Sequence, residues 1–216
     1  MKSEFTPLCL DAPGHGNNTN GARSLPQCAE EIAASMKTGI LVGYSMGARM
    51  ALHVALLHPE LVTQLVLISG TPGLKTDFER ATRIENDNEL ADRIENIGTP
   101  AFIDEWLALP IFSGLSDEIN QRNDRLRNTP QGLADSLRCA GTGTQEPQWS
   151  NLQQLSMPVH LIVGELDEKF TAIAREMKPL ISTSELTVVE NAGHTVHLEN
   201  PTTTGQLLDS IILRND

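Results

Sequence analysis

Leu-Val-Gly-Tyr-Ser-Met-Gly-Ala-Arg, residues 41–49, is the stretch of this chain that decides its fold. An apolar run at 39–42 enters it, and a helix-forming run at 48–57 leaves it. The pattern Gly-x-Ser-x-Gly between a strand and a helix is typical of an elbow that exposes a serine at the tip of a sharp turn. Ser45 is therefore the first candidate for a catalytic residue.

The residues around Ser45 suit such a turn. A strained turn leaves no room for side chains that would collide with the neighbouring backbone, which explains the glycines at 43 and 47. Met46 begins the helix, and negative charge is favoured at a helix N-terminus. We therefore expect the amide of Met46 to donate a hydrogen bond to an oxyanion.

Composition points to one acidic globular domain. The 216 residues, 39% hydrophobic and 20% charged, are enough for a single core and leave room for an insertion. A net charge of −12 argues against nucleic acid or an anionic membrane surface as a partner. No apolar run is long enough to span a membrane, and the first residues lack the apolar segment of a signal peptide.

The cysteines indicate a reducing compartment. Cys9, Cys28 and Cys139 form no Cys-x-x-Cys pair and no Cys/His cluster at metal-ligand spacing. We therefore expect a soluble cytoplasmic protein.

Apolar strands alternate with helical segments over much of the chain. The predicted strands are 7–11, 39–44, 61–69, 159–163 and 185–190. The predicted helices between and after them are 27–37, 46–58, 171–177 and 201–213. This alternation predicts an α/β fold with a mainly parallel sheet that is covered by helices on both faces.

The pattern changes between residues 74 and 150, where no continuous β-branched run occurs. Four helices are predicted there, at 78–97, 101–109, 116–127 and 130–139, with glycine and proline at the connections. We expect an α/β core formed by 1–73 and 151–216, and a helical cap formed by 74–150.

A catalytic serine needs a histidine to take its proton and an acid to orient that histidine. Asp167 and His194 each lie just past a predicted strand, where open α/β sheets build their sites. Asp167 could instead cap the following helix, and Glu165 and His197 are the nearest rivals. The order Ser, Asp, His is the one associated with the α/β-hydrolase fold.

Arg49 lies one helical turn after Ser45, on the same side of the predicted helix. Most other residues of this helix are small or apolar, so a role for the guanidinium in binding substrate or in structure is favoured over a surface position. A planar, permanently charged arginine suits carboxylate ligands.

The elbow with Arg49, the Pro72-Gly73-Leu74 turn and the segment 164–170 together resemble the synthases of 2-succinyl-6-hydroxy-2,4-cyclohexadiene-1-carboxylate (SHCHC) in menaquinone biosynthesis, an α/β-hydrolase-fold family. The resemblance runs from residue 8 to residue 201. It implies a carbon–oxygen lyase that eliminates pyruvate from 2-succinyl-5-enolpyruvyl-6-hydroxy-3-cyclohexene-1-carboxylate (SEPHCHC). Ser45 would act as the base, with His194 and Asp167 behind it, and no cofactor or metal would be needed.

The resemblance also implies a site for a small polycarboxylate substrate. The residues it assigns are Arg49, Arg83 and Arg127 for the carboxylates, and Tyr44, Trp106 and Phe112 for the aromatic wall. Arg80 is an alternative to Arg83, and Trp106 and Phe112 could equally pack the insertion onto the sheet.

One departure from the family concerns the beginning of the chain. Family members carry strands before the one expected at 7–11, together with a His-Gly-aromatic loop that supplies a second oxyanion donor. We expect an N-terminally truncated fold that lacks these strands. Two alternatives to the lyase stay open: a serine hydrolase of esters or carbon–carbon bonds, and a catalytically impaired form that only binds ligand. A monomer or a weak homo-oligomer is expected.

Overall fold

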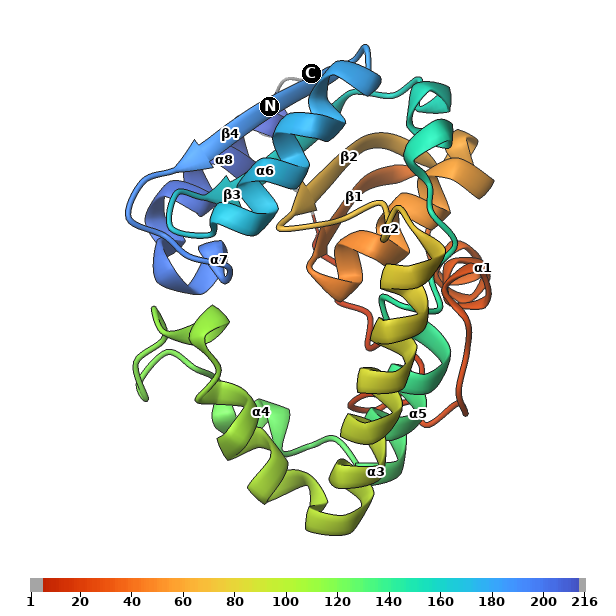
Figure 1. Cartoon of the computed structure of the whole chain (residues 1–216). Helices are drawn as coiled ribbons and strands as arrows, with labels where there is room; N and C mark the ends of the chain where they lie inside the picture. The colour runs from red at the N-terminus through yellow and green to blue at the C-terminus, as the bar shows by residue number, and fades with distance from the viewer. Residues whose placement is uncertain (1–5, 214–216) are drawn as a thin grey trace.

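The computed structural model describes residues 6–213, within which four parallel strands form one sheet in the order β1-β2-β3-β4 (Figure 1). The strands are β1 (Gly39–Tyr44), β2 (Val62–Ile68), β3 (Val159–Gly164) and β4 (Ser184–Val189). The register aligns Gly43 with Leu67, and Leu67 with Leu161. Because the strands are parallel, their carboxyl ends meet at one edge of the sheet, and the loops that follow them gather there.

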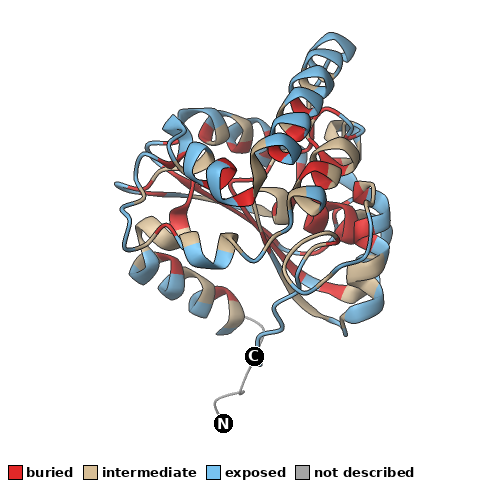
Figure 2. Cartoon of the chain, turned by 90° about the horizontal axis from the view of Figure 1, so that it is seen from below, coloured by how far each residue is buried: buried red, intermediate tan, exposed pale blue. Residues whose placement is uncertain are grey.

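Helices cover both faces of this sheet. Leu65 and Leu67 point to a core with α1 (Leu25–Ser35), α2 (Met46–Leu57) and α6 (Glu168–Met177). Val66 and Ile68 point to the opposite core, with α7 (Val196–Glu199) and α8 (Pro201–Leu213). Buried residues run along β2 and β3, the two inner strands, whereas β1 and β4 are only partly buried. Figure 2 shows the buried residues gathered along the sheet and on the sides of the helices that face it. The expected α/β architecture is confirmed: the sheet is parallel and has a helix-covered core on each face. Burial on both faces explains why the inner strands are apolar along their length.

The segment between β2 and β3 is helical throughout its regular structure. Its elements are α3 (Asp77–Leu107), η2 (Pro110–Phe112), α4 (Arg122–Arg125), α5 (Pro130–Ala140) and η3 (Trp149–Gln154). In α3, Gly98 leaves the helical conformation with φ 78° and ψ 165°, and Pro100 follows. The chain bends there, at the break that the sequence indicates, and runs back toward α7 (Figure 1). The division into core and cap stays a prediction.

The helix expected at 116–127 is mostly absent, and only α4 forms. Gln121 adopts a left-handed conformation with φ 55°, and the side chain of Asn120 accepts the amide of Arg122. Side-chain bonds of this kind compete with the helical pattern, so the polar sequence before α4 folds as turns.

The strand expected at 7–11 is wrong, because this segment has no regular structure. Leu8 and Leu10 are 65% and 43% exposed, and within residues 6–213 the strand β1 pairs only with β2. A single extended segment has no ladder to satisfy its backbone groups, so an apolar pattern alone does not form a strand. The following loop is held instead by the amide of Gly16, which donates to Oδ1 of Asn128 at 3.0 Å.

Among the helices of residues 6–213, none combines the length and the apolar character that a membrane span requires.

Candidate active site

Ser45 occupies a strained turn between β1 and α2. Its backbone has φ 50° and ψ −106°, and its amide donates to the carbonyl of Ile68 at 2.9 Å. A Cβ at Gly43 would lie 2.3 Å from the carbonyl oxygen of Gly47, so residue 43 must be glycine. A Cβ at Gly47 would meet nothing within 4 Å, so the collision expected at that position is absent. Met46 is the first residue of α2, where amides have no acceptor within the helix.

Ser45, His194 and Asp167 form one hydrogen-bonded chain. Nε2 of His194 lies 3.0 Å from Oγ of Ser45, and Nδ1 lies 2.7 Å from Oδ2 of Asp167. His194 and Asp167 are only 3% and 9% exposed, so solvent screens their interaction little. They follow β4 and β3, and Ser45 follows β1, which brings all three to the carboxyl edge of the sheet. The arrangement allows His194 to remove the serine proton while Asp167 stabilises the resulting imidazolium.

The alternatives to Asp167 and His194, Glu165 and His197, form no part of this hydrogen-bonded chain. Glu165 is exposed and accepts the amide of Asn191 at 3.1 Å, and the ring of His197 packs on Tyr44 at 4.6 Å between centroids. Asp167 also caps α6, because its Oδ1 accepts the amide of Phe170 at 3.2 Å. The two interpretations of Asp167 are thus compatible, since each uses a different oxygen.

Three aromatic rings surround the imidazole of His194. The centroid distances are 4.5 Å to Phe170, 5.4 Å to Tyr44 and 6.5 Å to Phe112. Burial raises the pKa of the Tyr44 phenol, whose hydroxyl lies 3.2 Å from Oγ1 of Thr195. Phe170 was missed by sequence analysis, although it falls within the segment that carries the resemblance.

Trp106 contacts Phe112 and is not among the three rings around His194. Its ring contacts Phe102 and Phe112 at 5.6 and 5.7 Å between centroids, inside the apolar cluster of the helical segment. Of the two predicted aromatic residues in this segment, Phe112 therefore approaches His194, and Trp106 contacts Phe112.

Arg49 is buried beside Arg83. It is 7% exposed, donates through Nη1 to the carbonyl of Ala140 at 2.8 Å, and has no acidic side chain of residues 6–213 within ion-pair distance. Burial, and then the charge of Arg83, lower the pKa of Arg49 to about 10. Arg83 pairs with Asp87 at 2.8 Å. Asp87, the carboxylate paired with Arg83, acts on Arg49 as well and raises its pKa, but it is not an ion-pair partner of Arg49. A buried guanidinium with no ion pair of its own within residues 6–213 suits an anionic ligand.

Arg125, which the sequence analysis did not single out, approaches the rings around His194, and the expected Arg127 pairs with Asp11 instead. Arg127 is exposed, and its guanidinium lies 3.7 Å from a carboxylate oxygen of Asp11. Arg125 instead reaches over the ring of Phe112, with 5.7 Å between its guanidinium carbon and the ring centroid. Its positive charge acts on Tyr44 and on His197, and it has no acidic partner within residues 6–213. Burial lowers the pKa of Arg125.

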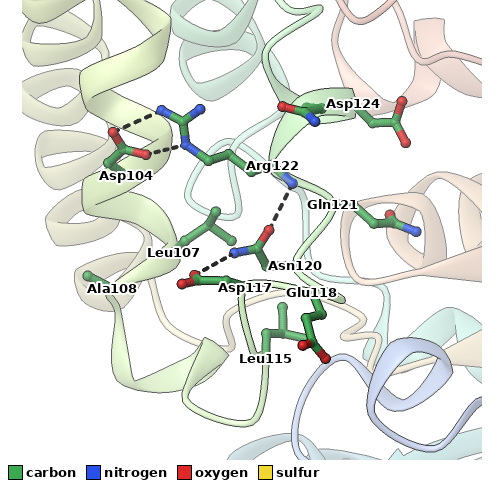
Figure 3. A pocket seen from close by; sticks show the side chains of 11 residues that line it. Asp104, Leu107, Ala108, Leu115, Asp117, Glu118, Asn120, Gln121, Arg122 and Asp124 are labelled. Carbon is green, nitrogen blue, oxygen red and sulfur yellow. Dashed lines mark hydrogen bonds and ion pairs between the residues drawn. The ribbon is translucent and has the colours of Figure 1, made fainter.

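A separate pocket of about 690 Å³ lies between α3 and α4 (Figure 3). Its acidic lining residues are Asp104, Asp117, Glu118 and Asp124. The one arginine among its lining residues, Arg122, is paired with Asp104 at 2.6 Å. Such a pocket repels carboxylates, and it includes no residue of the Ser45 chain. Across residues 6–213, no group of three histidine, cysteine or acidic side chains is arranged to hold a metal ion.

Comparison with known proteins fits this geometry. The family model described as "Alpha/beta hydrolase family" matches residues 2–205. A Bacillus subtilis (strain 168) protein named "Putative 2-succinyl-6-hydroxy-2,4-cyclohexadiene-1-carboxylate synthase" is 42% identical over 208 residues, which cover 94% of this chain and 76% of that protein. The chain belongs to the SHCHC synthase family of alpha/beta hydrolases. An SHCHC synthase of Enterobacter sp. (strain 638) is 30% identical over 97% of this chain and 82% of its own length.

Solved structures support the same placement. The structure of MenH from S. aureus superposes with a TM-score of 0.89 at 29% identity, covering 95% of this chain and 82% of that one. A thermophilic esterase from Thermogutta terrifontis, with a TM-score of 0.77 at 22% identity and coverage of 94% and 78%, shares the fold.

Proposed function

We propose that this SHCHC synthase family member is a carbon–oxygen lyase that eliminates pyruvate from SEPHCHC to give SHCHC. The names of its relatives support the activity. The observation that carries the proposal further is Arg49, a buried cation that forms no ion pair within residues 6–213 and lies one helical turn beyond Ser45. A hydrolase of neutral esters has no use for such a charge, whereas a polycarboxylate substrate would neutralise it.

In this reaction Ser45 acts as a base. His194 takes the serine proton, and the serine oxygen removes a proton from the substrate ring. The electron pair of the C–H bond at ring position 2 is delocalised onto the oxygen of the succinyl carbonyl and then forms the 2,3 double bond. The existing 3,4 double bond shifts to positions 4 and 5 as the C–O bond to the enolpyruvyl group breaks. The leaving enolpyruvate takes up a proton to become pyruvate. Asp167 orients His194 and balances its positive charge, while the Met46 amide stabilises the oxyanion that develops on the substrate.

The arginines would hold the substrate in place. Arg49 and Arg83 repel one another, so a carboxylate between them would relieve this repulsion. Arg125 would bind a further carboxylate from the side of Phe112, in the role that the resemblance implied for Arg127. Phe112 and Phe170 would exclude water from the reacting ring.

We further propose that the enzyme acts in the cytoplasm on a small molecule rather than on nucleic acid, as a monomer or weak homo-oligomer. The net charge of −12 and the absence of disulfides among Cys9, Cys28 and Cys139 support this assignment.

The deciding experiment measures pyruvate released from SEPHCHC by the purified protein, with Ser45→Ala as the matched control. We expect release from the native enzyme and its loss in the variant. Equal release by both proteins would contradict the role of Ser45. Ligand binding without release by the folded native protein would favour the binding-only alternative, and a stable acyl-serine formed from an ester probe would favour a hydrolase.

A further inference from the structure

The carboxylate of Glu199 holds the backbone on both sides of His194. Its Oε2 accepts the amide of Gly193 at 2.7 Å, and its Oε1 accepts the amide of Thr195 at 2.9 Å. Glu199 lies at the end of α7 and is only partly exposed. Hydrogen bonds from neutral donors to a charged acceptor are stronger than those between neutral groups, so this pair of bonds restrains the loop tightly.

A second contact fixes the carbonyl of the same histidine. Oγ of Ser69, a fully buried residue, donates to the carbonyl of His194 at 2.9 Å. Ser69 follows β2 with a φ of 49°, so its unusual backbone directs the hydroxyl to this position. Three hydrogen bonds thus hold the backbone of residues 193–195. They fix the position of the imidazole, so its hydrogen bonds to Ser45 and Asp167 form without further loss of conformational freedom.

The helical segment between β2 and β3 touches the same carboxylate. A Cβ at Gly114 would lie 2.0 Å from Oε2 of Glu199, the oxygen that accepts the Gly193 amide. Gly114 does not have a positive φ, so its backbone does not require glycine. A methyl group there would have to displace the Glu199 carboxylate, because the chain passes against it. Gly114 follows Phe112, the residue of this segment whose ring approaches His194.

We infer that Glu199 is a positioning residue for His194, and that the close fit of Gly114 couples the seating of the helical segment to the placement of the catalytic histidine. The inference rests on the proposed roles of Ser45 and His194 but not on the identity of the substrate. With the segment seated, Glu199 keeps both amide bonds. A displaced carboxylate releases Gly193, and the imidazole loses its fixed distance to Ser45.

The test uses Glu199→Gln, which preserves volume but replaces one acceptor oxygen by an NH2 group facing an amide donor. Glu190→Gln is the matched control, because Glu190 is an exposed acid on the same loop and, within residues 6–213, only its backbone carbonyl accepts a hydrogen bond. Two rates are measured across pH: the modification of Ser45 by a fluorophosphonate, and the release of pyruvate from SEPHCHC. We expect Glu199→Gln to lower both the labelling rate and kcat by about 10- to 100-fold with little change in KM, and Glu190→Gln to change neither.

A lower melting temperature with native labelling and kcat would show that Glu199 is only structural and would overturn the inference. Gly114→Ala tests the coupling in a double-mutant cycle. It should slow labelling in the native background and much less in the Glu199→Gln background, whereas additive effects would refute the coupling. Slower labelling in Glu199→Gln, together with no pyruvate release by the native protein, would contradict the proposed lyase while still supporting the positioning role.

Discussion

Oδ2 of Asp167 accepts a hydrogen bond from Nδ1 of His194 at 2.7 Å, while its other oxygen caps α6. A single side chain therefore caps a helix and also orients the imidazole of His194. Because the helix packs its inner side into the core, the position of the carboxylate is set by the fold rather than by the site alone.

Asp167→Asn should separate these two tasks. The asparagine oxygen can still cap α6, but its NH2 group would face Nδ1 and favour the histidine tautomer that cannot accept the serine proton. We expect kcat for pyruvate release to fall by about 10³- to 10⁴-fold. The melting temperature should stay near native, whereas Asp167→Ala should also lose the cap, worth about 1 kcal/mol. Near-native kcat in the Asp167→Asn variant would contradict the proposed role of Asp167 in orienting His194.

Arg125→Gln should weaken substrate binding, because a charged hydrogen bond to a carboxylate is lost. We expect KM to rise by about 10- to 100-fold. Arg122→Gln is the matched control, since Arg122 lies three residues away and is already paired with the exposed Asp104. Steady-state kinetics compare the two variants, and an equal rise in KM for both would show that Arg125 has no specific role.

Gly43→Ala should destabilise the fold, because the new methyl group would collide with the carbonyl of Gly47 at 2.3 Å. We expect a loss of about 1–3 kcal/mol or more in the free energy of unfolding, measured in urea. Gly47→Ala has free space around its Cβ and should unfold near the native midpoint. Similar losses in both variants would contradict the steric assignment.

His53 should make the protein less stable in acid. Burial lowers the pKa of His53 below its ordinary 6.5, despite a 2.8 Å hydrogen bond between Nδ1 and the carbonyl of Arg49. At a pH between the pKa of His53 in the folded protein and its pKa of 6.5 in the unfolded chain, the unfolded chain binds more protons. The contribution of His53 to stability is therefore fully present above pH 6.5 and is lost as the pH falls toward the pKa in the folded protein.

His53→Asn checks this contribution. Its side-chain amide can replace the donor to Arg49 but does not titrate. Urea unfolding at pH 5 and pH 7 should show a smaller loss of stability in the variant than in the native protein, by about 1.4 kcal/mol for each unit of pKa difference. An unchanged pH dependence would exclude a role for this ring.

The elements nearest Ser45 could be predicted because their signals are local. The boundaries of β1 match the apolar run before the elbow, and α2 ends at Leu57, next to the expected His58. Asp167 and His194 could be chosen because parallel strands deliver their following loops to one edge.

Other features depended on contacts that no local pattern contains. Arg125 and Arg127 lie two residues apart and point different ways, so choosing between them requires the orientation of α4. Leu8 and Leu10 have a strand-like pattern but no neighbouring strand within residues 6–213. Glu199 bonds to residues close in sequence, but its contact with Gly114, far away in the sequence, could not be predicted without the fold.

The position of β1 at the side of the sheet has a consequence for exchange with solvent. Within residues 6–213 it has a neighbour on one side only, so alternate amides along it lack a strand partner. Such amides exchange with deuterium quickly, while those of β3, flanked by β2 and β4, open only with larger unfolding. The strand that presents Ser45 is thus less protected from local opening than the strand that presents Asp167.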